Sequence, residues 1–279
     1  MGDETNNKTQ QEHVNPWKAS DYLEKWNPNA YLIYFNMNEN SFFRPFLDFQ
    51  TSNTSKILDT NLNKKQYRVL EYDGGPCRWS SLLLAHYFNE IWFCKFVPSN
   101  LESVQDWLDE KLNAFDWKPF FNYTLENGQI FRCDVNGKHS LFLDYPDNKN
   151  DQEQFDMIYS SFCLEIACPA YDIFRQTIYR FSNLLKPDGI LLISSFINAT
   201  SHIFNCNTFT DLPLNEEIIR ASFENTGHLT QPIRVSFDSK CDPLHGITDD
   251  RMIINYGFKI LGETDIFREY KLDYFKIIL

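Results

Sequence analysis

The feature that most constrains the fold is a regular alternation of short apolar strands with amphipathic helices through the middle of the chain. The predicted strands are 67–72, 90–97, 130–135, 155–160 and 190–195, and the predicted helices are 79–88, 100–112 and 171–185. Gly74, Gly75 and Pro76 form a turn between the first strand and the first helix. Strands that alternate with helices of this length pair in parallel through crossover connections. The sequence therefore predicts an α/β fold with a doubly wound, mostly parallel sheet.

The two ends of the chain have a different character. Residues 1–18 form a polar arm, and residues 19–62 carry two short aromatic-rich helices and a weakly helical stretch, which we interpret as a lid. The C-terminal part predicts a helix at 215–226 and strands at 233–238 and 251–260. We expect a single domain over 19–261, with the sheet core at 63–261, followed by an extension at 262–279.

Charge and cysteine content exclude several classes of function. The 38 acidic and 26 basic side chains give a net charge of −12, whereas nucleic-acid-binding proteins concentrate lysine and arginine. The seven cysteines are an odd number without paired Cys-x-x-Cys spacing, which indicates reduced core thiols and no metal site. No apolar run approaches the roughly 20 residues that span a bilayer, and residues 1–15 lack the features of a secretory signal. We expect a cytoplasmic protein without nucleic-acid or membrane partners.

A doubly wound sheet also predicts where a ligand binds. In such sheets the ligand lies at the carboxyl ends of the strands, beside the first glycine-rich turn, where the strand order reverses. A nucleoside-bearing cofactor additionally needs an acidic residue about 20 residues after the glycines, which accepts hydrogen bonds from the ribose hydroxyls. The Gly74-Gly75-Pro76 turn by itself is equally compatible with an ordinary turn.

A series of motifs in a fixed order is more specific than that turn. The motifs are Tyr22, Asn27-Pro28-Asn29-Ala30-Tyr31-Leu32, Gly75-Pro76, Ala114-Phe115-Asp116-Trp117, Cys133-Asp134-Val135, Ser160-Ser161-Phe162-Cys163-Leu164-Glu165, Leu184-Leu185-Lys186-Pro187-Asp188-Gly189 and Leu212-Pro213-Leu214. Together they closely resemble the nicotinamide, phenylethanolamine and thioether N- and S-methyltransferase family, from about residue 19 to residue 261. The resemblance implies a class I, Rossmann-like methyltransferase fold with a seven-stranded sheet, a monomeric protein, and S-adenosylmethionine as the cofactor.

The resemblance also implies which residues bind the cofactor. Tyr22 and Tyr31 would close the lid, Asp134 and Val135 would hold the adenine, and Ser161 would contact the methionine portion. The remaining cofactor-binding residues implied in this way are Gly74, Gly75, Trp79 and Asn100. Trp79 stands where the family has a tyrosine. Tyr22 and Tyr31 are alternatively core aromatics, and Asp134 is alternatively a cap at a strand end.

Two carboxylates, Glu165 and Asp249, match the positions that grip the amine in the phenylethanolamine branch of the family. Paired carboxylates stabilise an ammonium group and accept the proton that is lost when nitrogen is alkylated. The resemblance therefore implies catalytic roles for both residues and a small amine or pyridine-like substrate. The alternative for both residues is that they belong to a solvated acidic loop. Ser195 stands where the nicotinamide branch has an aspartate, which disfavours nicotinamide itself.

Two residues depart from the family's cofactor motifs. Asp73 stands at the first glycine of the turn, and Lys95 stands where the acidic ribose ligand is expected. Lysine has no acceptor for the ribose hydroxyls, so Lys95→Asp is expected to improve cofactor binding, and a pairing of Lys95 with Asp73 is a further hypothesis. Two functions remain open at this point. The first is methyl transfer to the nitrogen of a small amine or heteroaromatic compound, and the second is a lapsed paralogue that acts as a small-molecule-binding or regulatory protein.

Overall fold

The computed structural model describes residues 21–34, 44–62, 67–72, 75–115, 127–132, 154–204, 207–238 and 251–260. The strands of its central sheet are β1 (Tyr67–Tyr72), β2 (Phe88–Lys95), β3 (Asn127–Arg132), β4 (Phe155–Ser161), β5 (Leu185–Phe196), β8 (Ile233–Asp238) and β9 (Arg251–Phe258). They form a seven-stranded sheet in the order β3-β2-β1-β4-β5-β9-β8. The five strands from β3 to β5 pair in parallel, and β9 pairs antiparallel with β5 and β8. The order reverses between β1 and β4, which places the expected ligand site at their carboxyl ends.

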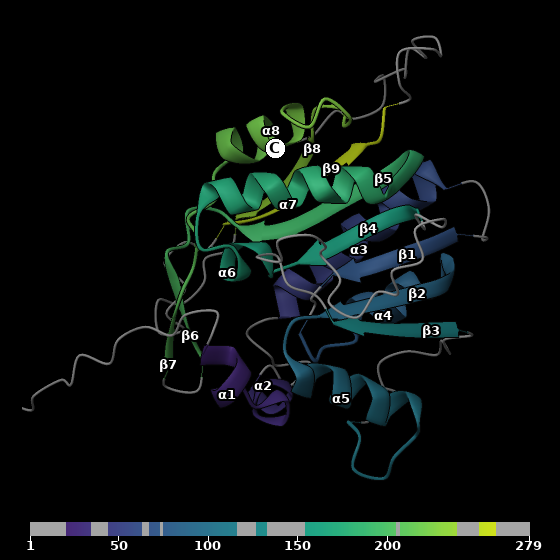
Figure 1. The fold of residues 1–279 in the computed structure, drawn as a ribbon, viewed down its shortest axis with the longest axis vertical. Helices are drawn as coiled ribbons and strands as arrows, with labels where there is room; N and C mark the ends of the chain where they lie inside the picture. The colour runs from purple at the N-terminus through teal and green to yellow at the C-terminus, as the bar shows by residue number, and fades with distance from the viewer. Residues whose placement is uncertain are drawn as a thin grey trace, which may run out of the picture.

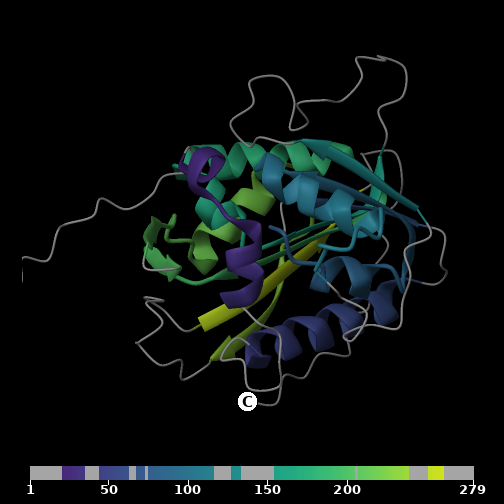
Figure 2. The ribbon, with the colours of Figure 1, turned by 90° about the horizontal axis from the view of Figure 1, so that it is seen from below.

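Helices cover both faces of this sheet. They are α1 (Tyr22–Lys25), α2 (Pro28–Tyr34), α3 (Arg44–Asn61), α4 (Trp79–Leu84), α5 (Pro98–Leu108), α6 (Leu164–Ala167), α7 (Tyr171–Leu184) and α8 (Glu216–Glu224). Figure 1 shows α7 and α8 in front of the sheet, and Figure 2 shows α3 and α7 on opposite sides of it. A separate hairpin of β6 (Ser201–Phe204) and β7 (Asn207–Thr210) lies at the end of the molecule where α1 is found (Figure 1).

The two faces of the sheet bury two separate apolar clusters, because successive side chains of a strand point to opposite sides. Leu70 of β1 belongs to the cluster under α7 and α8, whose members include Phe174, Phe181 and Phe223. The neighbouring Val69 belongs to the other cluster. That cluster contains Leu58 of α3, Leu82 of α4, Val104 of α5 and Met157 of β4. This continuous apolar packing on both faces is what a parallel sheet between two helical layers requires.

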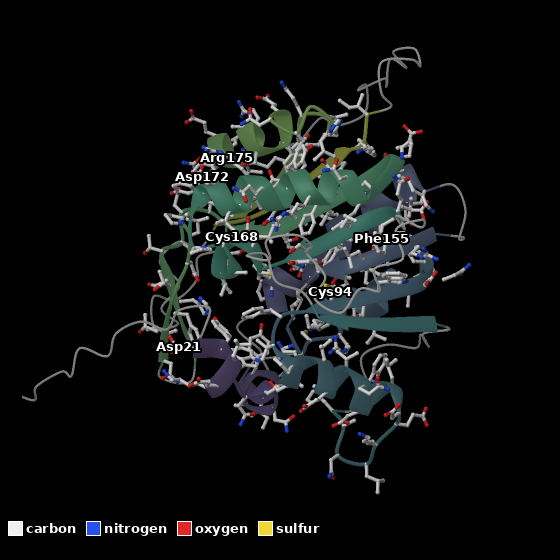
Figure 3. The ribbon with its side chains drawn as sticks, viewed as in Figure 1. Asp21, Cys94, Phe155, Cys168, Asp172 and Arg175 are labelled. Carbon is white, nitrogen blue, oxygen red and sulfur yellow. The ribbon has the colours of Figure 1, made fainter. Side chains whose placement is uncertain are left out.

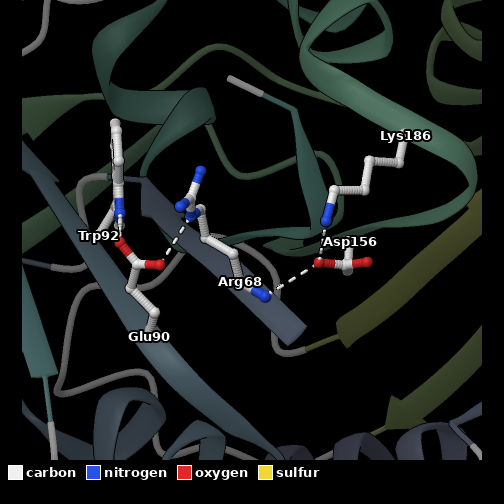
Figure 4. Close-up of polar contacts among 5 residues, drawn as sticks. All are labelled: Arg68, Glu90, Trp92, Asp156 and Lys186. Carbon is white, nitrogen blue, oxygen red and sulfur yellow. Dashed lines mark hydrogen bonds and ion pairs between the residues drawn. The ribbon is translucent and has the colours of Figure 1, made fainter. Parts of the chain in front are cut away.

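Charged side chains tie together the strand ends opposite to the expected ligand site (Figure 4). Asp156 Oδ2 accepts hydrogen bonds from the backbone N of Arg68 (2.9 Å) and from Lys186 Nζ (2.8 Å). Glu90 accepts from Arg68 Nε (2.8 Å) and from Trp92 Nε1 (2.6 Å). The four strands β2, β1, β4 and β5 are therefore linked at their amino ends by side chains as well as by the backbone ladder.

The structure confirms the predicted fold class and moves several boundaries. The strands predicted at 67–72 and 233–238 coincide with β1 and β8. The helix predicted at 79–88 ends at Leu84, because residues 85–87 form a turn and Phe88 already begins β2. β3 begins earlier than the predicted strand 130–135, since Asn127 pairs with Glu90 in the parallel register. Neither α6 nor the β6–β7 hairpin was predicted, because elements of four residues carry too little periodicity.

Four described cysteines, Cys77, Cys94, Cys163 and Cys168, are free thiols, as the sequence predicts. Figure 3 shows Cys94 and Cys168 on different parts of the fold, with Cys168 close to the start of α7. Burial raises the pKa of Cys168 to about 12, so this thiol is a core side chain and not a nucleophile at neutral pH. Among the described residues, no helix is long and apolar enough to cross a membrane, and no group of His, Cys, Asp and Glu side chains has the geometry of a metal site.

We predict that Glu90→Gln lowers the free energy of unfolding by about 1 kcal/mol at pH 7, because it removes a charged acceptor from the cluster in Figure 4. Burial alone would raise the pKa of Glu90, but the hydrogen bonds from Trp92 and Arg68 hold it below its usual value. A depressed pKa contributes stability above the unfolded pKa, and that contribution is lost as the pH falls through the folded value. Denaturant unfolding should show the deficit at pH 7 and its loss below about pH 4, whereas a pH-independent deficit would contradict this origin. Glu102→Gln, on the exposed face of α5, is the matched control.

Candidate functional site

The turn after β1 has the open geometry that a ligand needs. Gly75 has a φ of +59°, a backbone conformation that favours glycine. A Cβ built at Gly75 would meet no atom within 4 Å, so there is open space beside this turn. Tyr31 of α2 packs near Cys77 directly after it, and burial raises the pKa of the Tyr31 hydroxyl. Tyr31 therefore lies near the residue that follows the glycine-proline turn.

Lys95, the departure at the end of β2, is fully buried and forms an ion pair inside the protein. Its Nζ donates to Glu71 Oε1 at 2.7 Å, and both side chains are at most 1% exposed. Glu71 Oε2 accepts a hydrogen bond from Ser81 of α4. The partner of Lys95 in the structure is thus Glu71, while Asp73, the hypothesised partner, lies outside the described residues. Because its charge is compensated internally, Lys95 does not present an isolated cation to the cofactor region.

A second buried cation lies beside this pair. Arg78, directly before α4, is fully buried, and its guanidinium carbon lies 5.6 Å from the centre of the Phe93 ring. Nη1 donates to the carbonyl of Cys77 at 3.1 Å, whereas Nε and Nη2 have no hydrogen-bond partner. Burial lowers the pKa of Arg78 to about 10, and the Glu71 carboxylate opposes that shift. Glu71 therefore lies between two cationic side chains.

The lid contacts helix α5 through a hydrogen bond and the β6–β7 hairpin through aromatic rings. Trp26 Nε1 donates to Asn100 Oδ1 at 2.8 Å, which accounts for the burial of Asn100. The Trp26 ring lies 5.1 Å from Tyr22 and 5.1 Å from Tyr31, and Tyr22 lies 4.9 Å from Phe209 of β7. The aromatic residues Tyr22 and Tyr31 are therefore part of a packed cover that extends from α2 to β7.

The tip of β4 contacts helix α3. Gln50 Nε2 donates to Ser161 Oγ and to Tyr159 Oη. Phe162, the next residue after Ser161, has a φ of +50°, and its backbone N donates to Ser194 O at 2.9 Å. Gln50 thus fixes the hydroxyl that the resemblance assigns to the methionine portion of the cofactor.

Glu165 is a buried carboxyl group in α6, directly beyond the tip of β4. Its side chain is 3% exposed, its Oε1 accepts from the backbone N of Phe196 at 3.3 Å, and its Oε2 has no hydrogen-bond partner. Burial is the main reason why the pKa of Glu165 is raised to about 8, and the nearby Asp211 carboxylate raises it further. A buried carboxyl group with one unsatisfied oxygen is costly unless a ligand completes it.

Asp211, which follows β7, is brought to this position by the backbone. The N–H of Leu212 donates to Glu165 O at 2.6 Å, and the N–H of Asp211 donates to Thr200 O at 2.9 Å. Asp211 Oδ1 lies 2.8 Å from His202 Nδ1 on the paired strand β6. The His202 ring is stacked on Phe209 at 4.9 Å with an interplanar angle of 8°. The hairpin therefore delivers a second buried carboxylate to the region of Glu165.

The structure brings together Tyr22, Tyr31, Gly75, Trp79, Asn100, Ser161 and Glu165 along the carboxyl edge of the parallel strands or in the cover above it. Gly74, Asp134, Val135 and Asp249 lie outside the described residues, so their assignments stay predictions. The residues present fit S-adenosylmethionine at the open Gly75 turn, at buried Asn100 and at the Ser161 hydroxyl. Three buried hydroxyl groups at the ends of β4 and β5, those of Ser160, Ser194 and Ser195, have no protein partner.

Sequence reasoning missed Gln50, Arg78, His202 and Asp211. Gln50 lies in a helix of low amphipathicity, and Arg78 follows a glycine-proline turn at which nothing marks an inward-pointing side chain. The other two belong to or follow the β6–β7 hairpin, whose strands Ser-His-Ile-Phe and Asn-Thr-Phe-Thr are too short to show a period-2 alternation.

Comparison with known proteins places the chain among small-molecule methyltransferases. A family model described as the NNMT/PNMT/TEMT family matches residues 15–129 and 126–249. The chain is 25% identical over 227 residues to human nicotinamide N-methyltransferase, covering 74% of this chain and 83% of that protein. It is 23% identical over 180 residues to rat phenylethanolamine N-methyltransferase, covering 60% and 63%.

Solved structures agree on the fold. The crystal structure of magnesium protoporphyrin IX methyltransferase from Synechocystis PCC 6803 with bound S-adenosylmethionine matches with a TM-score of 0.56 at 11% identity. The match covers 86% of this chain and 94% of that protein. This likeness confirms the class I methyltransferase architecture that the sequence predicted.

We predict that Lys95→Met lowers the free energy of unfolding by about 3–5 kcal/mol, because it removes the ammonium group that donates to the buried Glu71 carboxylate. Lys95→Asp, which restores the family's acidic residue, should be at least as destabilising, since two carboxylates would then face each other. The expectation that Lys95→Asp improves cofactor binding stays a prediction, and the Glu71 partner adds a cost in folding stability to that substitution. Denaturant unfolding measures the effect, with Glu71→Gln combined with Lys95→Met as the uncharged control. A fully stable Lys95→Met protein would contradict the dependence of Glu71 on this lysine.

We predict that the effect of Glu165→Gln on the free energy of unfolding depends on pH and becomes more favourable as the pH rises. The pKa of Glu165 is raised from 4.5 to about 8 by burial, so the folded state retains a proton that the unfolded state releases between these values. The stability contributed by the protonated group is complete below the unfolded pKa and is lost as the pH rises through the folded pKa, by up to about 4 kcal/mol. Thermal unfolding at pH 5 and at pH 8.5 should therefore show that the stability of the variant relative to the native chain is greater at the higher pH. An unchanged difference between the two proteins would exclude a buried neutral Glu165.

Proposed function

Because the chain belongs to the NNMT/PNMT/TEMT family of S-adenosylmethionine-dependent methyltransferases, we propose that it transfers a methyl group to the nitrogen of a small amine or heteroaromatic compound. The observation that carries this proposal is Glu165, a buried carboxyl group with an unpartnered Oε2 beyond the tip of β4. It lies on the same carboxyl edge as the Gly75 turn, where the fold binds its ligand.

The chain's own residues align the substrate with the cofactor, exclude water from the site and supply a proton acceptor. Bound S-adenosylmethionine supplies a methyl group that is already activated by the positive sulfur. The aromatic cover of Tyr22, Trp26 and Tyr31 excludes water from the space beside Gly75. Alignment of this kind can contribute roughly 7–11 kcal/mol of the barrier. Glu165 releases its own proton to solvent when an ammonium substrate binds, and the carboxylate then accepts the proton that the ammonium group gives up before its nitrogen attacks. A pKa of about 8 suits both exchanges near neutral pH.

The nature of the substrate follows from the same residues. The relatives include proteins named nicotinamide, indolethylamine and phenylethanolamine N-methyltransferase, so both pyridine and amine nitrogens occur as acceptors. Ser195 supplies a neutral hydroxyl where a carboxylate would be expected for nicotinamide, whereas Glu165 supplies an anion for an ammonium group. This combination favours an amine.

The second function considered, a lapsed paralogue, has no support in the comparisons, all of whose named relatives are N-methyltransferases. Its sequence features were Asp73 and Lys95. Lys95 has a buried partner in Glu71, and Asp73 lies outside the described residues. The acidic net charge is compatible with a cytoplasmic monomer, which we include in the proposal.

The test is cofactor binding followed by methyl transfer. Calorimetry with S-adenosylhomocysteine should show saturable binding, and S-adenosylmethionine with a labelled methyl group should label an amine in a panel of arylalkylamines and pyridines. Glu165→Ala and Asp249→Ala should each lower kcat/KM for the best acceptor by roughly 1.5–3 kcal/mol, the range for hydrogen bonds to charged groups.

Asp172→Ala is the matched control for these variants, because Asp172 is exposed on α7 and its partner is Arg175 (Figure 3). Absence of cofactor binding at millimolar concentration would overturn the methyltransferase proposal. Unchanged kinetics in both acidic variants would leave methyl transfer standing but discard the carboxylate site.

A further inference from the structure

We propose that Asp211, held by His202, is a second substrate-binding carboxylate of this enzyme, and that with Glu165 it makes the site specific for cationic arylalkylamines over neutral pyridines. This inference rests on the proposed function and names the substrate class of that same site.

The hairpin fixes where the Asp211 carboxylate lies. The backbone bonds from Leu212 N to Glu165 O and from Asp211 N to Thr200 O hold the residue on both sides. Asp211 is 6% exposed and Glu165 is 3% exposed, so each carboxyl group is removed from water. Glu165 Oε2 has no partner in the described protein, which is an incomplete arrangement for a buried carboxyl group. A ligand that donates to this oxygen would complete it.

His202 gives Asp211 a permanent donor. An ionised carboxylate only accepts hydrogen bonds, so in the 2.8 Å contact His202 donates from Nδ1 to Asp211 Oδ1. Stacking on Phe209 fixes the plane of the imidazole ring. Phe209 in turn packs against Tyr22 and Trp26 of the lid region. The hairpin that holds Asp211 in contact with His202 therefore also contacts the cover.

The charges in this region favour a cation. The groups that interact with Glu165 are Asp211 and the Cys168 thiol, and His202 is paired with Asp211. From α1, Lys25 and Asp21 pair with each other at the exposed surface. Without a ligand, Asp211 and burial keep a proton on Glu165, which relieves the repulsion between the two carboxyl groups. An ammonium group would replace that proton, whereas a neutral pyridine brings no charge to do so.

Aromatic rings next to the carboxyl pair favour an aryl group on the ligand. Phe196, whose backbone N donates to Glu165, has its ring stacked on Phe162 at 4.8 Å. Both residues come from the ends of β4 and β5, beside the unpartnered hydroxyl of Ser195. An aromatic ring a short carbon chain away from an ammonium group matches this combination of flat apolar surface and buried anions.

The experiment measures proton release on binding in the presence of S-adenosylhomocysteine. The probes are 2-phenylethylamine, which is cationic, and 2-phenylethanol, its neutral analogue of similar shape. Calorimetry in buffers of different ionisation enthalpy should show that the amine displaces roughly nine-tenths of a proton at pH 7, the protonated fraction of a group with a pKa of about 8. The alcohol should displace none.

Variants of the pair distinguish its role from simple stabilisation of the fold. Asp211→Asn should weaken amine binding at least tenfold and reduce the proton release, while alcohol binding changes less than twofold. His202→Leu should weaken amine binding, and His202→Gln, which keeps a donor for Asp211, should restore most of it. Asp106→Asn, an exposed carboxylate of α5 paired with Lys111, is the matched control and should behave like the native chain.

Two outcomes would overturn the proposal. One is that the amine fails to bind at millimolar concentration to a protein that binds S-adenosylhomocysteine. The other is that Asp211→Asn changes amine and alcohol binding equally. In either case methyl transfer to another nitrogen compound would still establish the proposed function, so the two failures are distinguishable. Loss of S-adenosylhomocysteine binding in the native chain would instead count against the proposed function.

Discussion

The buried ion pair between Lys95 and Glu71 is the interaction on which the cofactor edge of this protein depends. It joins the carboxyl ends of β1 and β2 at 2.7 Å, with both side chains essentially inaccessible to water. Either charge alone at this depth would cost several kcal/mol. The pair therefore fixes the ends of β1 and β2 relative to each other, next to the Gly75 turn that follows β1. Ser81 of α4 donates to the same Glu71 carboxylate. The lid residue Tyr31 packs on this base.

The pair also accounts for the lysine that replaces the acidic residue of the family's ribose position. Such a lysine is unfavourable for cofactor binding if its ammonium group faces the cofactor without a counter-ion. Here Glu71, the acidic residue that ends the first strand of the motif, accepts the lysine from inside the protein. Arg78 adds a second buried cation near Glu71. The charge of Lys95 is thus compensated inside the protein by Glu71. The glycine turn keeps the open space that a ligand requires.

The opposite side of the site is organised by the β6–β7 hairpin. Its Phe209 joins the lid aromatics to the His202 ring, and its last residue passes directly into Asp211 beside Glu165. The hairpin therefore contacts both the aromatic cover and the carboxyl groups of the proposed substrate site. The ion pairs at the amino ends of the strands (Figure 4) lie at the other edge of the sheet and stabilise it without entering the site.

The sequence by itself determined the alternation of strands and helices, the position of the glycine turn and the family, because each of these is encoded in contiguous residues. Alternation along β1 puts Val69 and Leu70 on opposite faces of the sheet. The family resemblance implied Tyr22, Tyr31, Ser161 and Glu165 as site residues. Only the tertiary structure decided that Lys95 pairs with Glu71 and that Asp211 lies beside Glu165. Both contacts join elements that are distant in the chain. They depend on strand register and on the path of a hairpin, neither of which leaves a periodic signal in the residues that it brings together.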